Sequence, residues 1–399
     1  MVLKPQRGFW HLSADKQNEE IMKKNRVSIV FLLLFCTLIL GGCASQEKNE
    51  KKVEFKCTKK VELKYATQFS IEEYGKYDMI TIKDSGRFLI VPKGEKVPGN
   101  LPKDVTVLKR PLNKTYLVAT SAMDLIQSSG AMDNIRLSGT KADGWYIKEA
   151  AKAMNDGKIK YAGKYSAPDY ELILNEGCNL AIESTMIYHN PEVKEKLESL
   201  GIPVLVERSS YEKHPLGRLE WIKLYGVLFD RKKEAIDFYE KEMKKIEPVM
   251  KQEDNSDAKT VAFFYVMTNG AVSVRKPNDY IAKSISLAGG KYVPSNIDDE
   301  EKNALSTLNM QMEDFYAATR DADILIYNST IDGQINSIDD LIRKNKLFSD
   351  FKAVKNKNVY CTSGDFFQKT TGVGDFIVDM GNVLKSENEE ENTYIKKLR

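Results

Sequence analysis

The chain has 399 residues, of which 60 are Lys or Arg and 57 are Asp or Glu, so its formal net charge is only +3. Such a balance shows no excess of basic residues that would indicate nucleic-acid binding, and it is typical of an ordinary soluble surface. The length allows two domains, each with its own hydrophobic core. The five cysteines include no CxxC pair, which favours neither a zinc site nor a complete disulfide framework.

An uncharged apolar run over residues 27–40 follows Lys23, Lys24 and Arg26, which is the layout of a secretory signal peptide. About 14 residues are too few to span a bilayer, which needs roughly 20. The run ends in Leu40-Gly41-Gly42-Cys43, which resembles the lipobox of bacterial lipoproteins. This resemblance implies that Cys43 becomes the first residue of the mature chain and carries a fatty acyl anchor such as palmitate. The alternative is a short transmembrane anchor with an incidental cysteine.

The residues before the apolar run do not belong to a normal signal peptide, and Met22 is a better translation start than Met1. We divide the chain into an N-terminal extension and signal peptide (1–43), a charged flexible tether (44–60), an N-terminal α/β lobe (61–212), a linker helix (213–251) and a C-terminal α/β lobe (252–399). Whether Cys57, Cys178 and Cys361 pair is left open, and Cys178 is interpreted as a small core residue.

Strand and helix signals alternate through the first lobe, which indicates an α/β sheet that is mostly parallel. The predicted strands are 61–65, 79–82, 88–91, 105–108, 116–119, 135–138, 180–183 and 203–207, and the predicted helices are 121–129, 145–154, 169–175 and 192–200. Gly130 is a natural residue to end the first of these helices.

The segment from Pro215 to about Met250 differs, because its apolar residues recur with helical spacing and no Gly or Pro lies between Gly226 and Pro248. It predicts one helix of some thirty residues, about 45 Å long. The second lobe then begins with a hairpin around Asn269-Gly270, a strong short hairpin signal. Its predicted strands are 261–267, 271–274, 324–327 and 358–361, and its predicted helices are 279–287, 311–319, 338–344 and 375–384.

Local patterns along nearly all of the mature chain carry a family resemblance. They are Ala119-Thr120-Ser121-Ala122-Met123-Asp124 with Gly130, Ala167-Pro168-Asp169-Tyr170-Glu171, Leu200-Gly201-Ile202-Pro203-Val204, the segment His214 to Ile222, Leu287-Ala288-Gly289-Gly290, and Lys352-Ala353-Val354-Lys355-Asn356. In this order, on a secreted lipoprotein, they resemble the substrate-binding proteins of ABC importers for iron complexes and cobalamin. The resemblance implies two Rossmann-like α/β lobes joined by a single long helix, with a ligand cleft between the lobes.

The resemblance also implies partners. Members of this family present one glutamate on each lobe to arginines of a membrane permease, which works with an ATPase. The matching positions are Glu171 and Glu313, and each would form a rim salt bridge that sets register more than affinity. The interpretation without the resemblance is two ordinary surface glutamates.

Four residues are candidates for the cleft. Trp145 and Tyr146 follow Gly144 in a polar loop, Tyr211 precedes the long helix, and Arg275 follows the second strand of the hairpin. Aromatic rings supply flat contact area, and a guanidinium group matches the carboxylate or catecholate oxygens of an anionic metal chelate. The alternatives are interlobe packing for the aromatic residues and an ion pair for Arg275. Phe366, Phe367 and Gln368 could face the cleft from the second lobe.

The predicted ligand is a small metal chelate of the Fe(III)-siderophore type, bound by a monomer on the outer face of the cell membrane. Haem stays open if Met186, Tyr188 or a histidine supplies an axial ligand, and cobalamin would need only aromatic walls and hydrogen bonds. The mature chain has only two histidines, His189 and His214, without clustered partners, so no bare-metal site is predicted. An extracytoplasmic enzyme is the rival class, but no GxSxG, HExxH, GxGxxG or P-loop pattern occurs, and we expect no catalytic residue.

Overall fold

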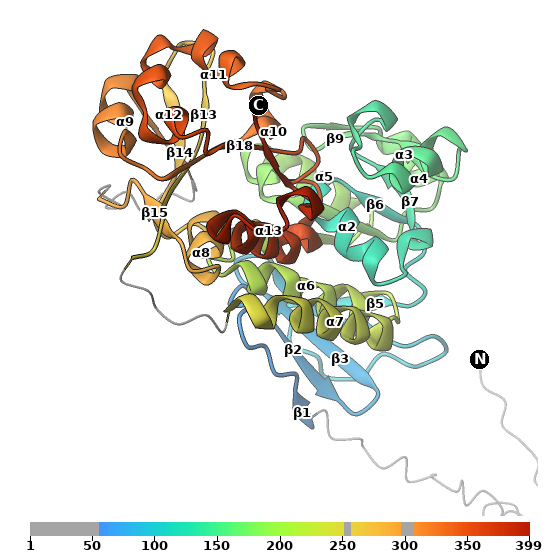
Figure 1. Ribbon diagram of the computed structural model, residues 1–399. Coiled ribbons are helices and arrows are strands. Elements are labelled where there is room, and N and C mark those ends of the chain that lie inside the picture. The colour runs from blue at the N-terminus through green and yellow to red at the C-terminus, as the bar shows by residue number, and fades with distance from the viewer. Residues whose placement is uncertain (1–55, 251–256, 297–306) are drawn as a thin grey trace, which may run out of the picture. The chain divides into compact units, whose positions relative to one another are not determined.

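The computed structural model describes residues 56–250, 257–296 and 307–399 (Figure 1). The predicted signal peptide, Cys43 and most of the predicted tether lie outside these residues. Within the described ranges, no helix has the length and apolar character that crossing a membrane requires.

Residues 59–109 form a sheet of their own, with strands in chain order. The strands are β1 (Lys59–Lys60), β2 (Phe69–Tyr74), β3 (Tyr77–Ile82), β4 (Gly86–Val91) and β5 (Val105–Lys109). Neighbours are antiparallel except for the parallel pair β4 and β5. The predicted strand 61–65 is wrong, as is the prediction that this part joins a mostly parallel sheet. A tight turn at Gly75-Lys76, with Gly75 at φ +64°, reverses the chain between β2 and β3.

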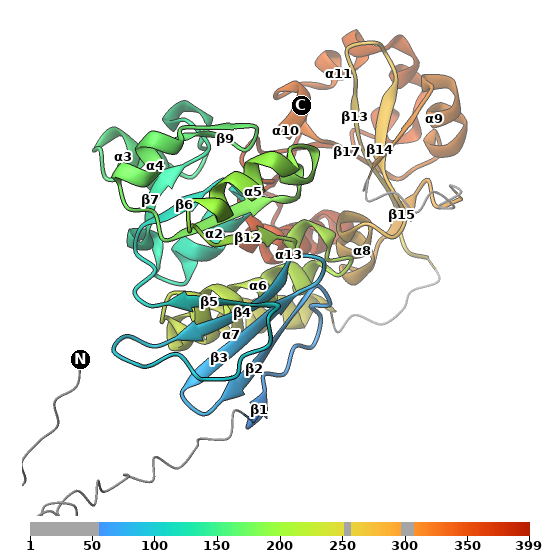
Figure 2. The ribbon, with the colours of Figure 1, turned by 180° about the vertical axis from the view of Figure 1, so that it is seen from behind.

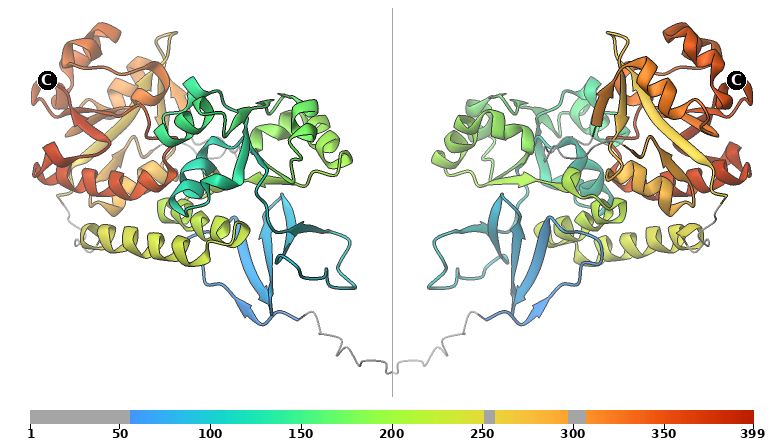
Figure 3. Two further views of the ribbon diagram at one scale, coloured as in Figure 1. Left: turned by 90° about the vertical axis from the view of Figure 1, so that its right-hand side faces the viewer. Right: turned by 90° about the vertical axis from the view of Figure 1, so that its left-hand side faces the viewer.

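The second sheet of the first lobe is wholly parallel, as the alternation of strands and helices predicts. Its order is β12 (Val204–Glu207), β11 (Leu180–Ser184), β6 (Thr115–Leu117), β7 (Ile135–Ser138) and β8 (Lys160–Tyr161). Its helices are α2 (Thr120–Ser128), α3 (Lys148–Asn155), α4 (Tyr170–Asn175) and α5 (Pro191–Ser199), and β9 (Gly163–Lys164) pairs with β10 (Ala167–Pro168). Gly130 follows α2 at φ +74°, which confirms its predicted role. In Figure 3 the N-terminal strands form a layer apart from this sheet.

The predicted single linker helix is two helices, α6 (Pro215–Leu228) and α7 (Lys232–Met250). The chain breaks at Asp230, which adopts a left-handed conformation with φ +62°. The two helices pack closely where Gly226 meets Ala235, since a Cβ on Gly226 would lie 2.6 Å from the Cβ of Ala235. Almost every residue of α6 is buried, whereas α7 buries only one stripe.

The second lobe is built on a mixed sheet. Its described order is β16 (Thr307–Met310), β14 (Val272–Arg275), β13 (Thr260–Val266), β17 (Ile324–Tyr327), β18 (Val359–Thr362) and β19 (Ile395–Lys397), with β15 (Lys291–Val293) also paired to β13. Its helices are α8 (Tyr280–Leu287), α9 (Met312–Thr319), α10 (Ser329–Asp332), α11 (Ile338–Lys344), α12 (Lys352–Lys355) and α13 (Val373–Lys385). The predicted hairpin around Asn269-Gly270 is confirmed by the antiparallel pairing of β13 and β14.

Helix α6 lies at the centre of the core. It packs against α2 of the first lobe and against α8 and α13 of the second. Figure 1 shows α13 beside α6 and α7, and Figure 2 shows β2, β3 and β4 in front of the same two helices. Phe69 of β2 contacts Trp221 of α6, with ring centroids 4.8 Å apart. One helix therefore shares its buried surface with both lobes and with the N-terminal sheet.

Residues 64–68, which we call the strap, are held on α6 by two buried carboxylates. Glu220 accepts hydrogen bonds from the backbone N–H groups of Lys64, Tyr65 and Ala66, at 3.0, 2.7 and 2.7 Å. Glu212 accepts those of Thr67 and Gln68, at 2.8 and 2.9 Å, and also binds the indole N–H of Trp221. Five consecutive N–H groups without a strand partner are thus satisfied by two side chains.

Candidate functional site

Several large side chains that follow the carboxyl ends of the parallel strands in the first lobe are exposed to solvent. Tyr146 follows β7 and is 56% exposed, while Met186 and Tyr188 follow β11 and are 45% and 43% exposed. Tyr211 follows β12, where its half-buried ring lies under the Arg208 guanidinium at 4.4 Å. Crevices outside the carboxyl ends of strands are where open α/β sheets bind ligands.

The second lobe shows the same feature. Ile331, on α10 after β17, is 59% exposed, and the half-buried Phe367 follows β18. We call Tyr146, Met186, Tyr188, Tyr211, Ile331 and Phe367 the strand-end surface. Its side chains are aromatic or apolar, which suits a flat ligand with a large hydrophobic area.

Of the two adjacent aromatic residues predicted for the cleft, only Tyr146 is accessible. Trp145 is 6% exposed and its indole N–H donates to Ser138 Oγ at 3.3 Å, so the ring packs into the core at the end of β7. The backbone N–H of Tyr146 donates to Gln368 Oε1 of the second lobe at 2.8 Å. The structure therefore brings together two predicted loops that lie more than two hundred residues apart.

Arg275 has an internal partner. It is 9% exposed, and its Nε lies 3.2 Å from Asp279 Oδ1, while its guanidinium lies over the rings of Tyr280 and Phe367. In the antiparallel pairing of β14 with β13, Val274 lies opposite Phe264, so Arg275 follows level with the middle of β13. The ion-pair alternative accounts for this residue, and we do not propose it as a ligand contact.

Glu171 and Glu313 occupy equivalent places on the two lobes. Each is exposed, and each is the second residue of a helix, α4 or α9. A negative charge at a helix N-terminus is locally favourable, and neither carboxylate has an ion pair among the described residues that would occupy it. Both are available to a cationic partner.

Two buried carboxyl groups lie near the carboxyl ends of neighbouring strands in the first lobe, Glu183 on β11 and Glu207 on β12. Glu207 accepts hydrogen bonds from Ser121 Oγ at 3.0 Å and from the Ser209 N–H at 2.8 Å, yet burial still raises its pKa. Glu183 is fully buried, and within the described residues neither of its oxygens has a hydrogen-bond partner. Burial raises the pKa of Glu183 to about 8, so it is largely protonated at neutral pH.

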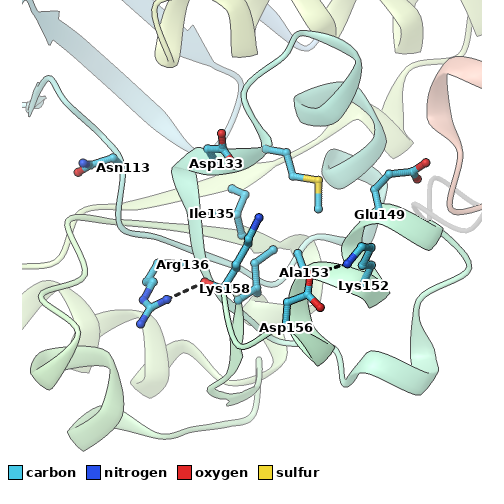
Figure 4. Close-up of a pocket in the computed structure, with 11 residues that line it drawn as sticks. Asn113, Asp133, Ile135, Arg136, Glu149, Lys152, Ala153, Asp156 and Lys158 are labelled. Carbon is cyan, nitrogen blue, oxygen red and sulfur yellow. Dashed lines mark hydrogen bonds and ion pairs between the residues drawn. The ribbon is translucent and has the colours of Figure 1, made fainter.

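A groove of about 500 Å³ lies elsewhere on the first lobe, between the amino end of β7 and helix α3 (Figure 4). Its floor includes Ile135 and Ala153, and charged residues form its rim. Lys152 pairs with Asp156 at 2.7 Å, and Arg136 donates to the carbonyl of Lys158 at 2.7 Å. These cations are thus satisfied within the lobe, and the groove contains none of the predicted cleft residues.

The described residues contain no group of three or more His, Cys, Asp or Glu side chains that could hold a metal ion. His214 stacks on Tyr65 with ring centroids 4.5 Å apart, and its Nδ1 accepts the Leu216 N–H at 3.2 Å, which makes it a helix cap. His189 is exposed on the same turn as Met186 and Tyr188. Cys57, Cys178 and Cys361 are free thiols, and Cys178 is half-buried beside the core of the first lobe.

Two α/β lobes with aromatic or apolar side chains at the ends of their strands form the arrangement in which open α/β sheets bind small ligands. A model of the periplasmic binding protein family matches residues 134–365, which is more than half of the chain. The chain therefore belongs to the periplasmic binding protein family, and the predicted resemblance is confirmed.

The relatives fit this assignment. An uncharacterized lipoprotein of Methanocaldococcus jannaschii is 25% identical over 91% of this chain and 94% of its own length. The structure resembles the periplasmic haem-binding protein HutB of Vibrio cholerae, with a TM-score of 0.54 and 17% identity over 67% of this chain and 97% of that one. It also resembles the iron-uptake ABC transporter substrate-binding protein PiuA of Streptococcus pneumoniae, with a TM-score of 0.52 and 18% identity over 67% and 92%. At such identities these structures establish the two-lobed fold.

Proposed function

We propose that this protein is the extracytoplasmic substrate-binding component of an ABC importer, which captures a metal chelate of the Fe(III)-siderophore type and delivers it to a membrane permease. The strand-end surface is the observation that carries this proposal. Its exposed aromatic side chains lie at the edge where open α/β sheets bind ligands. The family assignment supports the same function. The protein binds and releases its ligand unchanged and is not an enzyme.

A haem or a corrinoid is the second candidate, because of one particular turn. Met186 and Tyr188 lie two residues apart on the turn after β11, and both side chains are exposed. The Met186 thioether sulfur can ligate haem iron, and either side chain can cover the face of a macrocycle, while the Tyr188 hydroxyl donates to the Asp84 carbonyl at 2.9 Å. The haem-binding name of one structural relative adds support to this candidate.

Titration of the full-length protein in detergent with a ferric siderophore, haemin and cyanocobalamin tests the proposal. We expect one of these compounds to bind with one-to-one stoichiometry and to be recovered unchanged. Replacing Tyr146 by Ala should weaken that ligand about tenfold, since one exposed ring contributes about 1.4 kcal/mol of contact energy. Ile236→Ala, an exposed apolar residue on α7, is the control and should leave the affinity unchanged. Chemical conversion of the ligand, or binding of none of the three, would refute the proposal.

The proposal places the mature protein on the outer face of the cell membrane as a monomer, held by an acyl group on Cys43. Metabolic labelling of the full-length chain with a radioactive fatty acid should label the natural protein and not Cys43→Ser.

Glu171 and Glu313 are proposed to dock the permease and its ATPase. The double substitution Glu171→Ala with Glu313→Ala should leave ligand affinity unchanged and reduce import at least tenfold, because the two rim salt bridges that set the register would be lost. Uptake of the radiolabelled ligand by cells that carry the permease measures this effect. Glu192→Ala with Glu234→Ala, two other exposed helical glutamates, is the control. Normal import by the first double variant would remove the docking assignment.

A further inference from the structure

One segment of the second lobe, residues 364–371, makes direct hydrogen bonds to the first lobe at three points. The Thr371 N–H and Oγ1 donate to Asp124 Oδ2 at 2.7 and 2.6 Å. Thr370 Oγ1 donates to the carbonyl of Ser121 at 2.7 Å. The third point is Gln368. The segment therefore forms a continuous seam between the lobes.

The Gln368 side chain pairs with the loop that carries Tyr146. Its Nε2 donates to the Gly144 carbonyl at 2.8 Å, and its Oε1 accepts the Tyr146 N–H at 2.8 Å. The side-chain amide of Gln368 thus pairs with one backbone carbonyl and one backbone N–H of the same loop. The Tyr146 ring lies against Gly364, where an added Cβ would be 3.6 Å from Cε1. We call the two hydrogen bonds of Gln368 the latch.

The two ends of the seam differ in burial and strength. Asp124 is 9% exposed and accepts both Thr371 hydrogen bonds on one oxygen, while α6 packs against both α2 and the short helix Thr370–Gly372 beside it. The hydrogen bonds of the latch are solvent-exposed. An exposed neutral hydrogen bond contributes about 1 kcal/mol, because water replaces the partner when it breaks. A small separation of the lobes would therefore open the latch first and pivot about the buried end.

We propose that Gln368 controls access to the ligand site, and that ligand exchange at the strand-end surface requires the latch to open while the Asp124 contact to Thr371 stays closed. The part of this inference that concerns ligand exchange rests on the proposed function. The latch joins Tyr146 of one lobe to the loop of Phe367 in the other, so it closes one side of the surface on which the ligand is proposed to lie. The family match ends at residue 365, so Gln368 lies beyond the segment that establishes the family.

Hydrogen exchange of the full-length protein, followed at the Tyr146 and Thr371 amides, tests the latch without any ligand. We expect the Tyr146 amide to exchange at least tenfold faster than the Thr371 amide, because the two open in different events. Gln368→Ala should speed exchange at Tyr146 at least fivefold while leaving Thr371 and the melting temperature unchanged. Lys369→Ala is the matched control, since that side chain pairs with Asp365 of its own lobe at 2.7 Å. Exchange of both amides in one common opening, or no effect of Gln368→Ala, would overturn the proposal.

Binding kinetics with haemin as the probe separate control of access from general damage to the site. Gln368→Ala should raise the association and dissociation rate constants together, about tenfold each, with little change in Kd, whereas damage to the site would weaken binding. A slower association with unchanged dissociation would contradict the latch. Should haemin not bind, the exchange measurement still decides the inference, so failure of the proposed function and failure of the latch remain distinguishable.

Discussion

Replacing Glu183 by Gln is expected to make the protein more stable above neutral pH and to leave it unchanged near pH 4.5. In the folded protein the pKa of Glu183 is raised to about 8 by burial, against an ordinary value of 4.5. The folded state then holds a proton that the unfolded state releases, so the stability contributed by this group is complete below pH 4.5 and is lost as the pH rises toward 8. The loss amounts to roughly 3 to 5 kcal/mol.

Chemical denaturation of both proteins from pH 4.5 to 8.5 measures this effect. The difference in the free energy of unfolding should grow steadily with pH, because glutamine cannot ionise. Burial lowers the pKa of His214 to about 4, which gives the opposite trend between pH 4 and 6.5, but His214 is present in both proteins and cancels in the difference. Parallel curves for the two proteins would show that Glu183 keeps an ordinary pKa.

Replacing Glu220 by Ala is expected to lower the free energy of unfolding by about 4 kcal/mol, because three backbone N–H groups of the strap and the half-buried ammonium of Lys223 lose their acceptor. Burial alone would raise the pKa of Glu220, but the N–H groups of the strap reverse this effect and lower it. The carboxylate is therefore bound in its ionised form.

Urea denaturation at pH 7 measures this loss in the free energy of unfolding. Glu220→Gln retains one acceptor oxygen and should lose about half as much stability as Glu220→Ala. Glu234→Ala, on the exposed face of α7, serves as the control and should change stability by less than about 0.5 kcal/mol. An equally small loss for Glu220→Ala would mean that water replaces the carboxylate and that the strap is held by other contacts.

The fold could be predicted wherever a local signal marks each boundary. The parallel sheet of the first lobe follows from apolar strands punctuated by glycine, and Asn269-Gly270 predicts the hairpin between β13 and β14. The break at Asp230 could not be predicted in this way, because the helical spacing continues on both sides of it. Strand β2 is not predicted from the sequence, because its solvent-facing residues, among them Ser70 and the half-exposed Glu72, interrupt the apolar pattern of its buried face.

The site was less predictable, because it depends on contacts between distant residues. Tyr146 and Gln368 were each candidates for the cleft, but their pairing spans 222 positions and has no local signature. Arg275 is predicted for the cleft because it follows a strand, but the same local pattern fits the ion pair that it makes with Asp279. Met186 and Tyr188 could be found from their place directly after a buried strand, whereas the exposure of Ile331 could not.

The strap has a practical consequence for shortened versions of this protein. A fragment that starts at residue 69 would remove the five N–H groups that Glu212 and Glu220 accept, and would leave these buried carboxylates with only their partners on α6 and α7. A soluble fragment therefore has to begin upstream of Lys64. Tension on the N-terminal end of the chain would likewise reach α6 directly. Mechanical load would then pass to the helix that both lobes share, and neither lobe would be pulled away from the other.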